Sequence, residues 1–325
     1  MLKANRVVAA IAVLLLAGCG GGGGGTSVST SSTTPTIPVT PVQTVAPAGT
    51  VSTTALSATN LQFPEGLAAS PDGRTLYVAN ASDDSITEID LSTAGYPQRT
   101  LPLVVSGTAS TPYTLQAPAG LAVSPDGSTL YIANFGVSPS NGFIAQVALA
   151  SGATSTLAYT GSPSIDNPTG LAVTATSLYV ANHGGQNVLQ VSLGTSSAPL
   201  AYYANSSSPI NPWDVLLTSS GTVYVTDNEA STLGSFNTNS GVLDPASYRV
   251  VGTALGAPTG ATEIGSYLYI ASYQNKAIYK VDPSSGAIVD TLNVTPHQPF
   301  FLANDGTHLF FTDGNDGSVD EIVQP

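Results

Sequence analysis

Apolar and polar positions along most of the chain follow one recurring order. A short apolar run such as Gly66 to Ala69 is followed by a polar turn and by a second apolar run, Leu76 to Ala79. A third segment, Ile86 to Asp90, alternates apolar and polar residues, which is typical of a strand with one buried and one hydrated face. The first two runs lack this alternation, so we expect strands that are covered on both faces. A fourth, more polar segment, such as Arg99 to Val105, completes the unit as an outer strand.

This unit recurs six times, which predicts an all-β fold. Each clear copy opens with Pro-x-Gly, turns at Pro-Asp-Gly and closes with Leu-Tyr-Val-Ala-Asn; in such turns Pro fixes φ and Gly accepts a positive φ. Four antiparallel strands per copy, stacked around an axis, form a propeller. The opening residues are 41 to 54 positions apart, the period of propeller blades, and they are Pro64, Pro118, Pro168, Pro212, Pro258 and Pro299. The sequence therefore predicts a six-bladed β-propeller with four-stranded antiparallel blades.

The sixth copy contains only three strands, the last of them Ser318 to Val323. Its unpaired edge needs a partner. The segment Thr50 to Leu56 is rich in the β-favouring residues Val and Thr, and we expect it to close the last blade as an N-terminal strand. The propeller domain would then span residues 48–325. A seventh blade would have to lie within residues 26–62, where the Pro- and Thr-rich composition disfavours it.

The repeat resembles the NHL-type and YVTN-type propeller repeats, in which a Pro-x-Gly-Leu-Ala-Val strand leads into Leu-Tyr-Val-Ala-Asn/Asp. The resemblance covers roughly residues 50 to 325. It is specific for architecture and says little about chemistry, because propellers serve as binding modules, scaffolds, lactonases and lyases.

The N-terminus has the pattern of a secretory signal. Lys3 and Arg6 precede the apolar run Val7 to Leu16, which is too short to span a bilayer. The following Leu-Ala-Gly-Cys resembles the lipobox of bacterial lipoproteins, which implies lipidation of Cys19. We therefore expect a signal peptide at 1–18 and a disordered Gly/Ser/Thr/Pro-rich tether at 19–47. The alternative is an ordinary signal peptide followed by an unrelated cysteine.

This resemblance implies a lipid-anchored protein of the bacterial cell envelope. Gly20 is not the Asp that often marks inner-membrane retention, so we expect the outer membrane, with the propeller facing the periplasm or the exterior. The single cysteine excludes intramolecular disulfides. We expect a monomer.

Charge narrows the choice of partners. The predicted mature part holds 20 acidic residues against five basic ones, which excludes the clustered positive charge that nucleic-acid binding needs. The partner is therefore expected to be an unknown protein, peptide or glycan, and the function that of a binding module without a cofactor or metal.

Candidate ligand-binding residues lie where the inner strands begin and the second strands end. Because these strands are antiparallel, both sets fall on one side of the propeller, here called the Pro-x-Gly face. We hypothesise that Glu65 and Asp214 mark a ligand-facing rim there. The full predicted set is Glu65, Asp214, Trp213, Asn182, His183 and Asp227. Two structural explanations compete with it: the Asn and Asp residues cap turns, and Trp213 and Phe300 fill the axis.

The enzymatic alternative is a lyase or hydrolase at the channel mouth. In six-bladed lactonases of the gluconolactonase type, several residues before the Gly hold a divalent metal, but here only Glu65 has a suitable side chain. In outline, His183 and His297 resemble the arrangement of virginiamycin-type lyases, with Glu65 or Asp227 as acid–base partner. We assign no catalytic residue and expect no metal site. A group of His and carboxylate side chains within hydrogen-bond reach on one face would favour the enzyme.

Two further features have structural explanations. Asp313 to Gly317 lacks the Gly and Glu positions of a calcium-binding EF-hand loop, and we interpret it as the turn between the second and third strands. His308 begins a second strand on the opposite face, and we interpret it as structural.

Overall fold

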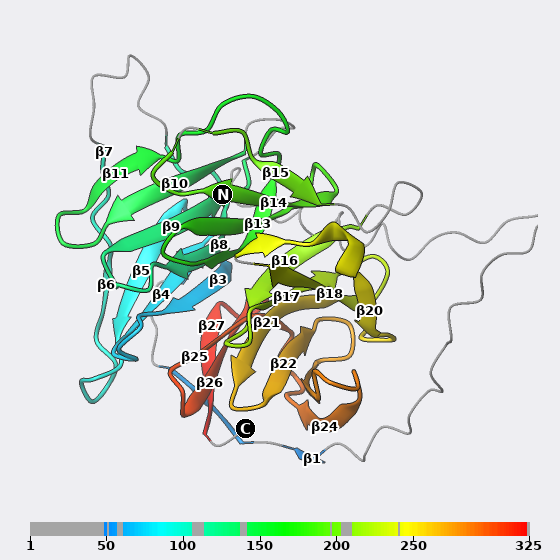
Figure 1. Cartoon of the computed structure of the whole chain (residues 1–325). Helices are drawn as coiled ribbons and strands as arrows, with labels where there is room; N and C mark the ends of the chain where they lie inside the picture. The colour runs from blue at the N-terminus through cyan, green and yellow to red at the C-terminus, as the bar shows by residue number, and fades with distance from the viewer. Residues whose placement is uncertain are drawn as a thin grey trace, which may run out of the picture.

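The computed structural model describes residues 49–50, 52–56, 61–105, 114–136, 142–195, 197–202, 210–239 and 241–323. The predicted signal peptide, Cys19 and the predicted tether lie outside the described residues. The described part forms six β-sheets arranged around a central axis (Figure 1). This confirms the predicted all-β, six-bladed β-propeller.

Each blade contributes one innermost strand and one second strand. The innermost strands are β3 (Pro64–Ala69), β8 (Pro118–Val123), β12 (Pro168–Val173), β16 (Pro212–Leu217), β21 (Pro258–Ile264) and β25 (Pro299–Asn304). The second strands are β4 (Thr75–Asn80), β9 (Thr129–Asn134), β13 (Ser177–Asn182), β17 (Thr222–Asp227), β22 (Tyr267–Ser272) and β26 (His308–Asp313). Blades one to six are named here in this order.

The third strands are β5 (Ser85–Asp90), β10 (Phe143–Ala148), β14 (Asn187–Ser192), β18 (Thr232–Asn239), β23 (Ala277–Val281) and β27 (Ser318–Val323). The outer strands are β6 (Gln98–Thr100), β11 (Ala153–Thr156), β15 (Leu200–Tyr202), β19 (Val242–Leu243) with β20 (Arg249–Gly252), β24 (Ile288–Asn293) and β2 (Thr53–Ala55). A short 3-10 turn, η2 (Pro245–Ser247), precedes β20.

The N-terminal strand closes blade six as predicted. Strand β2 pairs antiparallel with β27, with Thr53 opposite Ile322. The Leu56 backbone N–H extends this pairing by donating to the Val319 carbonyl at 2.9 Å. Leu56 itself is buried in the apolar cluster between blades six and one. The ring is therefore closed by chain segments from its two ends.

Two outer segments differ from the expectation. The predicted outer strand Arg99 to Val105 pairs within blade one only at its start, as part of β6. Strand β7 (Val104–Val105) instead pairs parallel with β11 of blade two. Likewise, β1 (Gly49–Thr50) pairs parallel with β24 of blade five, and the two labels lie together in Figure 1. These segments cross between blades because an open outer edge offers unpaired backbone groups.

The core lies between neighbouring blades. Ile86 of blade one packs in the same cluster as Leu121 and Leu130 of blade two, and the other interfaces repeat this arrangement. The second strands are covered on both faces, which explains their continuous apolar sequence. Apolar burial of this kind is the main favourable contribution to folding.

In four of the six blades the innermost strands approach one another so closely at the Pro-x-Gly motif that a Cβ atom on the glycine would clash with the next blade. A Cβ atom on Gly66 would lie 2.0 Å from the Ala119 carbonyl oxygen of the next blade. Each innermost strand also shifts register against its second strand just after the proline. In the described part of the chain, no helix is long and apolar enough to cross a membrane.

Candidate functional site

An aromatic cluster closes the axis at the Pro-x-Gly face. Trp213, Phe300 and Phe301 are almost completely buried there. The rings of Trp213 and Phe300 meet edge to face with centroids 5.6 Å apart, and Tyr273 contacts Phe300 in the same way at 5.8 Å. This confirms the interpretation that Trp213 and Phe300 are core residues filling the axis, and we call the cluster the axial plug.

At the opposite face the axis is open. A cavity of about 350 Å³ is lined by the carboxyl-terminal halves of all six innermost strands. Most of its lining residues are apolar in type, for example Leu67, Ala122 and Leu171, and Asp214, Thr262 and Asn304 are polar, yet the surface exposed to the cavity is more polar than apolar. We call this cavity the axial funnel. The innermost strands begin at the plug and end at the funnel mouth, so one end of the channel is closed and the other accessible.

Asp214 is the ionisable side chain of the funnel lining. It stands at the position of the glycine in the Pro-x-Gly motif. Its carboxylate fits beside Gly170 of the neighbouring blade because that residue has no side chain: a Cβ atom on Gly170 would lie 2.0 Å from Asp214 Oδ1. Its Oδ2 accepts a hydrogen bond from the Ala261 N–H at 2.9 Å, and its Oδ1 one from the Val215 N–H at 2.8 Å. Burial raises the pKa of Asp214 to about 7, against these two hydrogen bonds that lower it.

Glu65 is buried near the start of β3, with 2% of its surface exposed. Among the described residues its Oε1 atom has no hydrogen-bond partner. Burial raises the pKa of Glu65 to about 8, which favours the protonated carboxyl at neutral pH. The expected exposed rim is therefore corrected: Glu65 and Asp214 both lie in the interior, because the plug and the close approach of the innermost strands remove them from water. Their role in ligand binding stays a prediction.

The polar residues that end the second strands cap turns. Asn182 Oδ1 accepts from the Asp166 N–H at 2.6 Å, and Asp227 Oδ2 accepts from the Asn211 N–H at 3.1 Å. In other blades the equivalent bonds join Gln62 to Asn80, Gln116 to Asn134 and Gln298 to Asp313. The capping interpretation is therefore confirmed, and it explains why Asn or Asp recurs at this position.

His183 belongs to the plug rather than to an acid–base pair. Its ring packs on Trp213 with centroids 5.2 Å apart, and its Nδ1 lies 3.2 Å from the Pro212 carbonyl oxygen. Burial lowers the pKa of His183, which favours the neutral imidazole. The interactions observed among the described residues do not join His183 to Glu65 or Asp227.

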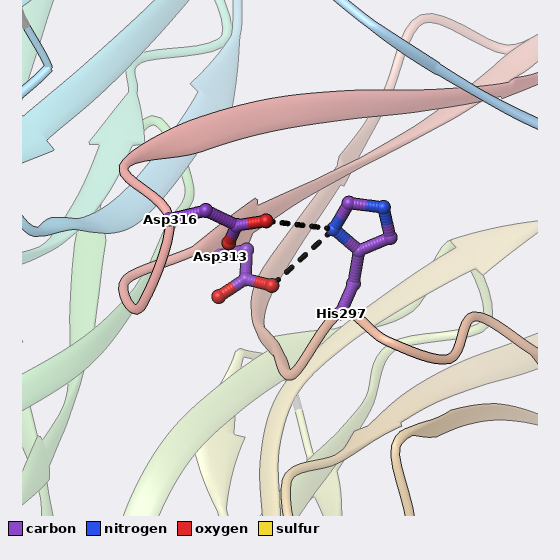
Figure 2. A group of neighbouring side chains, drawn as sticks. All are labelled: His297, Asp313 and Asp316. Atoms are coloured by element: carbon purple, nitrogen blue, oxygen red, sulfur yellow. Dashed lines mark ion pairs between the residues drawn. The ribbon is translucent and has the colours of Figure 1, made fainter.

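A group that the sequence analysis did not assemble lies on the Pro-x-Gly face of blade six. His297 Nδ1 is 3.3 Å from Asp313 Oδ2, 3.4 Å from Asp316 Oδ2 and 3.8 Å from Asp320 Oδ2. Figure 2 shows both Asp313 and Asp316 directed at the imidazole. Burial raises the pKa of Asp313 and of Asp320. We call these four residues the blade-six cluster.

The expected turn at Asp313 to Gly317 is confirmed. The Gly317 N–H donates to the Asp313 carbonyl at 3.0 Å, and the Asn315 N–H donates to Asp313 Oδ1 at 2.9 Å. The sequence does contain a signal for the cluster: two Asp residues in this turn, and a histidine two positions before Pro299. The sequence does not show that the histidine and the turn lie close together in space.

His308, interpreted as structural, pairs with acidic residues on the opposite face. Its Nδ1 lies 2.8 Å from Asp305 Oδ2, and its Nε2 lies 3.7 Å from Glu321 Oε1. The Asp305 carboxylate also accepts the His308 backbone N–H at 2.7 Å. These contacts hold the start of β26 in place, as that interpretation predicts.

Comparison with known proteins identifies the fold. No protein-family model matches the chain, and no curated protein matches its sequence. Among solved structures it is similar to regucalcin, a calcium-binding protein from Agrobacterium tumefaciens, with 16% identity and a TM-score of 0.65 over 86% of this chain and 95% of that one. It is also similar to a catalytically inactive virginiamycin B lyase from Staphylococcus aureus with quinupristin, with 14% identity and a TM-score of 0.60 over 84% and 99%. A chain of a nidogen/laminin complex matches with 16% identity and a TM-score of 0.56 over 72% and 81%. At these identities the similarity shows a shared fold, and the chain is a six-bladed β-propeller.

Proposed function

We propose that this protein is a binding module of the bacterial cell envelope that accepts a segment of a protein, peptide or glycan in its axial funnel. The observation that carries the proposal is the asymmetry of the channel. The plug closes the Pro-x-Gly end, and the other end opens into about 350 Å³ with Asp214 among its lining residues. A concavity of a few hundred Å³ that is open at one end is a usual form of a ligand site. The proposal therefore moves the ligand from the Pro-x-Gly face to the funnel.

The charge of the funnel mouth limits the chemistry of the ligand. The exposed turns after β3 and β8 carry Asp72 and Asp126, and Glu263 lies at the end of β21. Hydrogen bonds from Ser124 and Ser128 hold the pKa of Asp126 at about 2, so this group is ionised at neutral pH. An acidic mouth repels anions, and we infer that the inserted segment is neutral or cationic.

Filling the funnel tests this function. Ala69 lines the funnel and is partly exposed, and it also packs against the apolar cluster between blades six and one, so Ala69→Trp adds an indole at the wall of the cavity and its melting temperature is measured alongside binding. On arrays of peptides and glycans, we expect the wild-type protein to bind a defined subset, and Ala69→Trp to weaken that binding at least ten-fold. The matched control is Val242→Trp, which adds the same side chain at an exposed position on the outer strand of blade four.

Two results would contradict the funnel as the binding site. One is that Ala69→Trp binds the same array members as strongly as the wild-type protein while both melt at similar temperatures. The other is that Val242→Trp weakens binding to the same extent. If substitutions in the axial plug abolish binding and the protein stays folded, the binding site lies at the Pro-x-Gly face.

Attachment to the membrane is part of the same proposal. A lipid on Cys19 would hold the propeller at the membrane surface, and the 20 acidic residues exclude attraction to an anionic lipid surface as the attachment force. The predicted tether would leave either face free to meet a ligand.

One observation favours the alternative, a lyase or hydrolase. The blade-six cluster is a group of His and carboxylate side chains within 3.3 to 3.8 Å on one face. If the protein is an enzyme, we infer that catalysis takes place at this cluster and not in the funnel. Incubation with quinupristin and with simple lactones, followed by mass spectrometry, separates the two functions. Turnover that disappears in His297→Ala would establish the enzyme.

A further inference from the structure

Blade six differs from blade one at two equivalent buried positions. In blade one, Asn80 Nδ2 donates to Thr87 Oγ1 at 2.9 Å. The strand registers place Asp313 and Asp320 at the same two positions of blade six. Their side chains are only 2% and 1% exposed. A neutral amide–hydroxyl hydrogen bond is thus replaced by two buried carboxyl groups, which cannot donate to each other when ionised.

The charges of the cluster do not balance within the protein. Asp316, which is about half exposed, adds a third carboxylate beside His297. With all three carboxyl groups ionised, one imidazole cannot neutralise the cluster, whatever its protonation state. Buried charges require pairing or metal coordination, since removing them from water is costly. A divalent cation has the charge that is missing here.

The distances from His297 Nδ1 to the three carboxylates match ligands around one ion better than direct ion pairs. A charge-assisted hydrogen bond spans about 2.7–2.9 Å, as in the 2.8 Å contact from His308 Nδ1 to Asp305 Oδ2. The three separations from His297 Nδ1 are longer, between 3.3 and 3.8 Å. Ligand atoms placed about 2.0–2.2 Å from a tetrahedral Zn²⁺ lie about 3.4 Å from one another. The Nδ1 atom is itself buried and makes no hydrogen bond to the described residues.

We propose that His297, Asp313 and Asp316, with Asp320 as a fourth donor, bind a divalent transition-metal ion such as Zn²⁺ or Mn²⁺. One ligand atom from each of the first three residues lies within 4.8 Å of the others. The imidazole nitrogen selects transition metals over Ca²⁺ and Mg²⁺, which take oxygen ligands. The Asp316 side chain is 52% exposed, so the site is open to solvent on that side.

The surrounding structure orients the ligands. The Gln298 N–H donates to Asp313 Oδ2 at 2.8 Å, and Ser318 Oγ donates to Asp320 Oδ2 at 2.5 Å. Such outer partners fix the direction of ligand side chains. The site is distinct from the axial funnel, and it revises the expectation of no metal.

Isothermal titration calorimetry on the full chain, purified in detergent without an affinity tag and dialysed against EDTA, tests the site. We expect one equivalent of Zn²⁺ or Mn²⁺ to bind at pH 7.5 and to raise the melting temperature, with Ca²⁺ and Mg²⁺ much weaker. Asp316→Asn, at an exposed position, should weaken binding at least ten-fold. The double variant Asp313→Asn/Asp320→Thr recreates the blade-one pair, and it should fold and bind no metal.

Two matched controls make the result specific. Asp83→Asn changes the residue at the Asp316 position of the blade-one turn, and His308→Gln changes a histidine that pairs with carboxylates on the opposite face. Both should bind the metal as the wild-type protein does. The proposal is overturned if the wild-type protein binds none of the four ions, if it prefers Ca²⁺ or Mg²⁺, or if either control weakens binding as much as Asp316→Asn. Because Asp316→Asn changes a solvent-facing side chain, it decides the question even if the double variant is unfolded.

Discussion

The buried carboxyl of Glu65 links protein stability to pH. In the unfolded chain this group ionises near its ordinary pKa of 4.5, whereas burial raises its pKa to about 8 in the folded protein. The folded state therefore holds a proton that the unfolded state has released. Its contribution is fully present below about pH 4.5 and is lost as the pH rises through 8.

Glu65→Gln, which is neutral at every pH, tests this linkage. Relative to the wild-type protein, the variant should become more stable as the pH rises from 4.5 to 8, by on the order of 3–5 kcal/mol at the upper end. Urea unfolding at pH 4.5, 6 and 8 measures the difference. Asp214 and the other titratable groups are common to both proteins, so their contributions cancel. A difference that is the same at all three pH values would show that Glu65 is ionised inside the folded protein.

Asp214 and Gly170 show how one residue depends on another in the adjacent blade. The carboxylate fits against Gly170 only because that residue has no Cβ, and it accepts hydrogen bonds from two backbone N–H groups. Removing the side chain would leave both donors unsatisfied in a buried position. Because Glu65 and Asp214 are both buried and do not form an exposed rim, we expect Glu65→Ala and Asp214→Ala to lower the melting temperature.

At the scale of elements, β2 joins the two ends of the ring. Its hydrogen bonds to β27 and the burial of Leu56 close the edge of blade six. Without it, β27 would present unpaired backbone groups to solvent, and apolar residues between blades six and one would be uncovered.

Deleting residues 48–60 is therefore expected to lower the melting temperature by ten degrees or more and to promote aggregation. Deleting residues 26–44, in the predicted tether, should change neither property. Differential scanning calorimetry and light scattering report the two effects. If both deletions are equally harmless, closure by β2 does not contribute to stability, and the model of the ring would have to be revised.

At the scale of the whole molecule, membrane attachment is expected to depend on one residue. Cys19 is the only cysteine, and in the described part of the chain no helix could cross a membrane. Cys19→Ser should therefore move the protein from the membrane fraction to the soluble fraction, since a lipid chain contributes roughly 0.8 kcal/mol for each buried CH₂ group. Fractionation after a high-salt wash, with the wild-type protein as control, measures this. A mutant that stays with the membranes would exclude lipid anchoring at this site.

The sequence by itself determined the number of blades, the position of their inner strands and the closure by an N-terminal strand. These features depend on short-range chemistry that recurs from blade to blade: runs of apolar residues, turn residues, and an Asn or Asp cap such as Asn182 at the end of five of the six second strands. The outer strands were predicted less well, because β7 pairs with the blade after its own, and their few polar residues specify no particular partner.

Only the tertiary structure decided which end of the channel is closed, how deeply Glu65 and Asp214 are buried, and that His297 faces three carboxylates. The axis is built from six segments spread over more than two hundred residues, and a side chain there meets neighbours from other blades. Whether Trp213 fills the axis or lines an open mouth depends on Phe300, which lies two blades further on. His297 likewise meets Asp313 only because β25 and β26 fold back on each other. Distances of this kind arise from packing between segments and leave no periodic signal in the sequence.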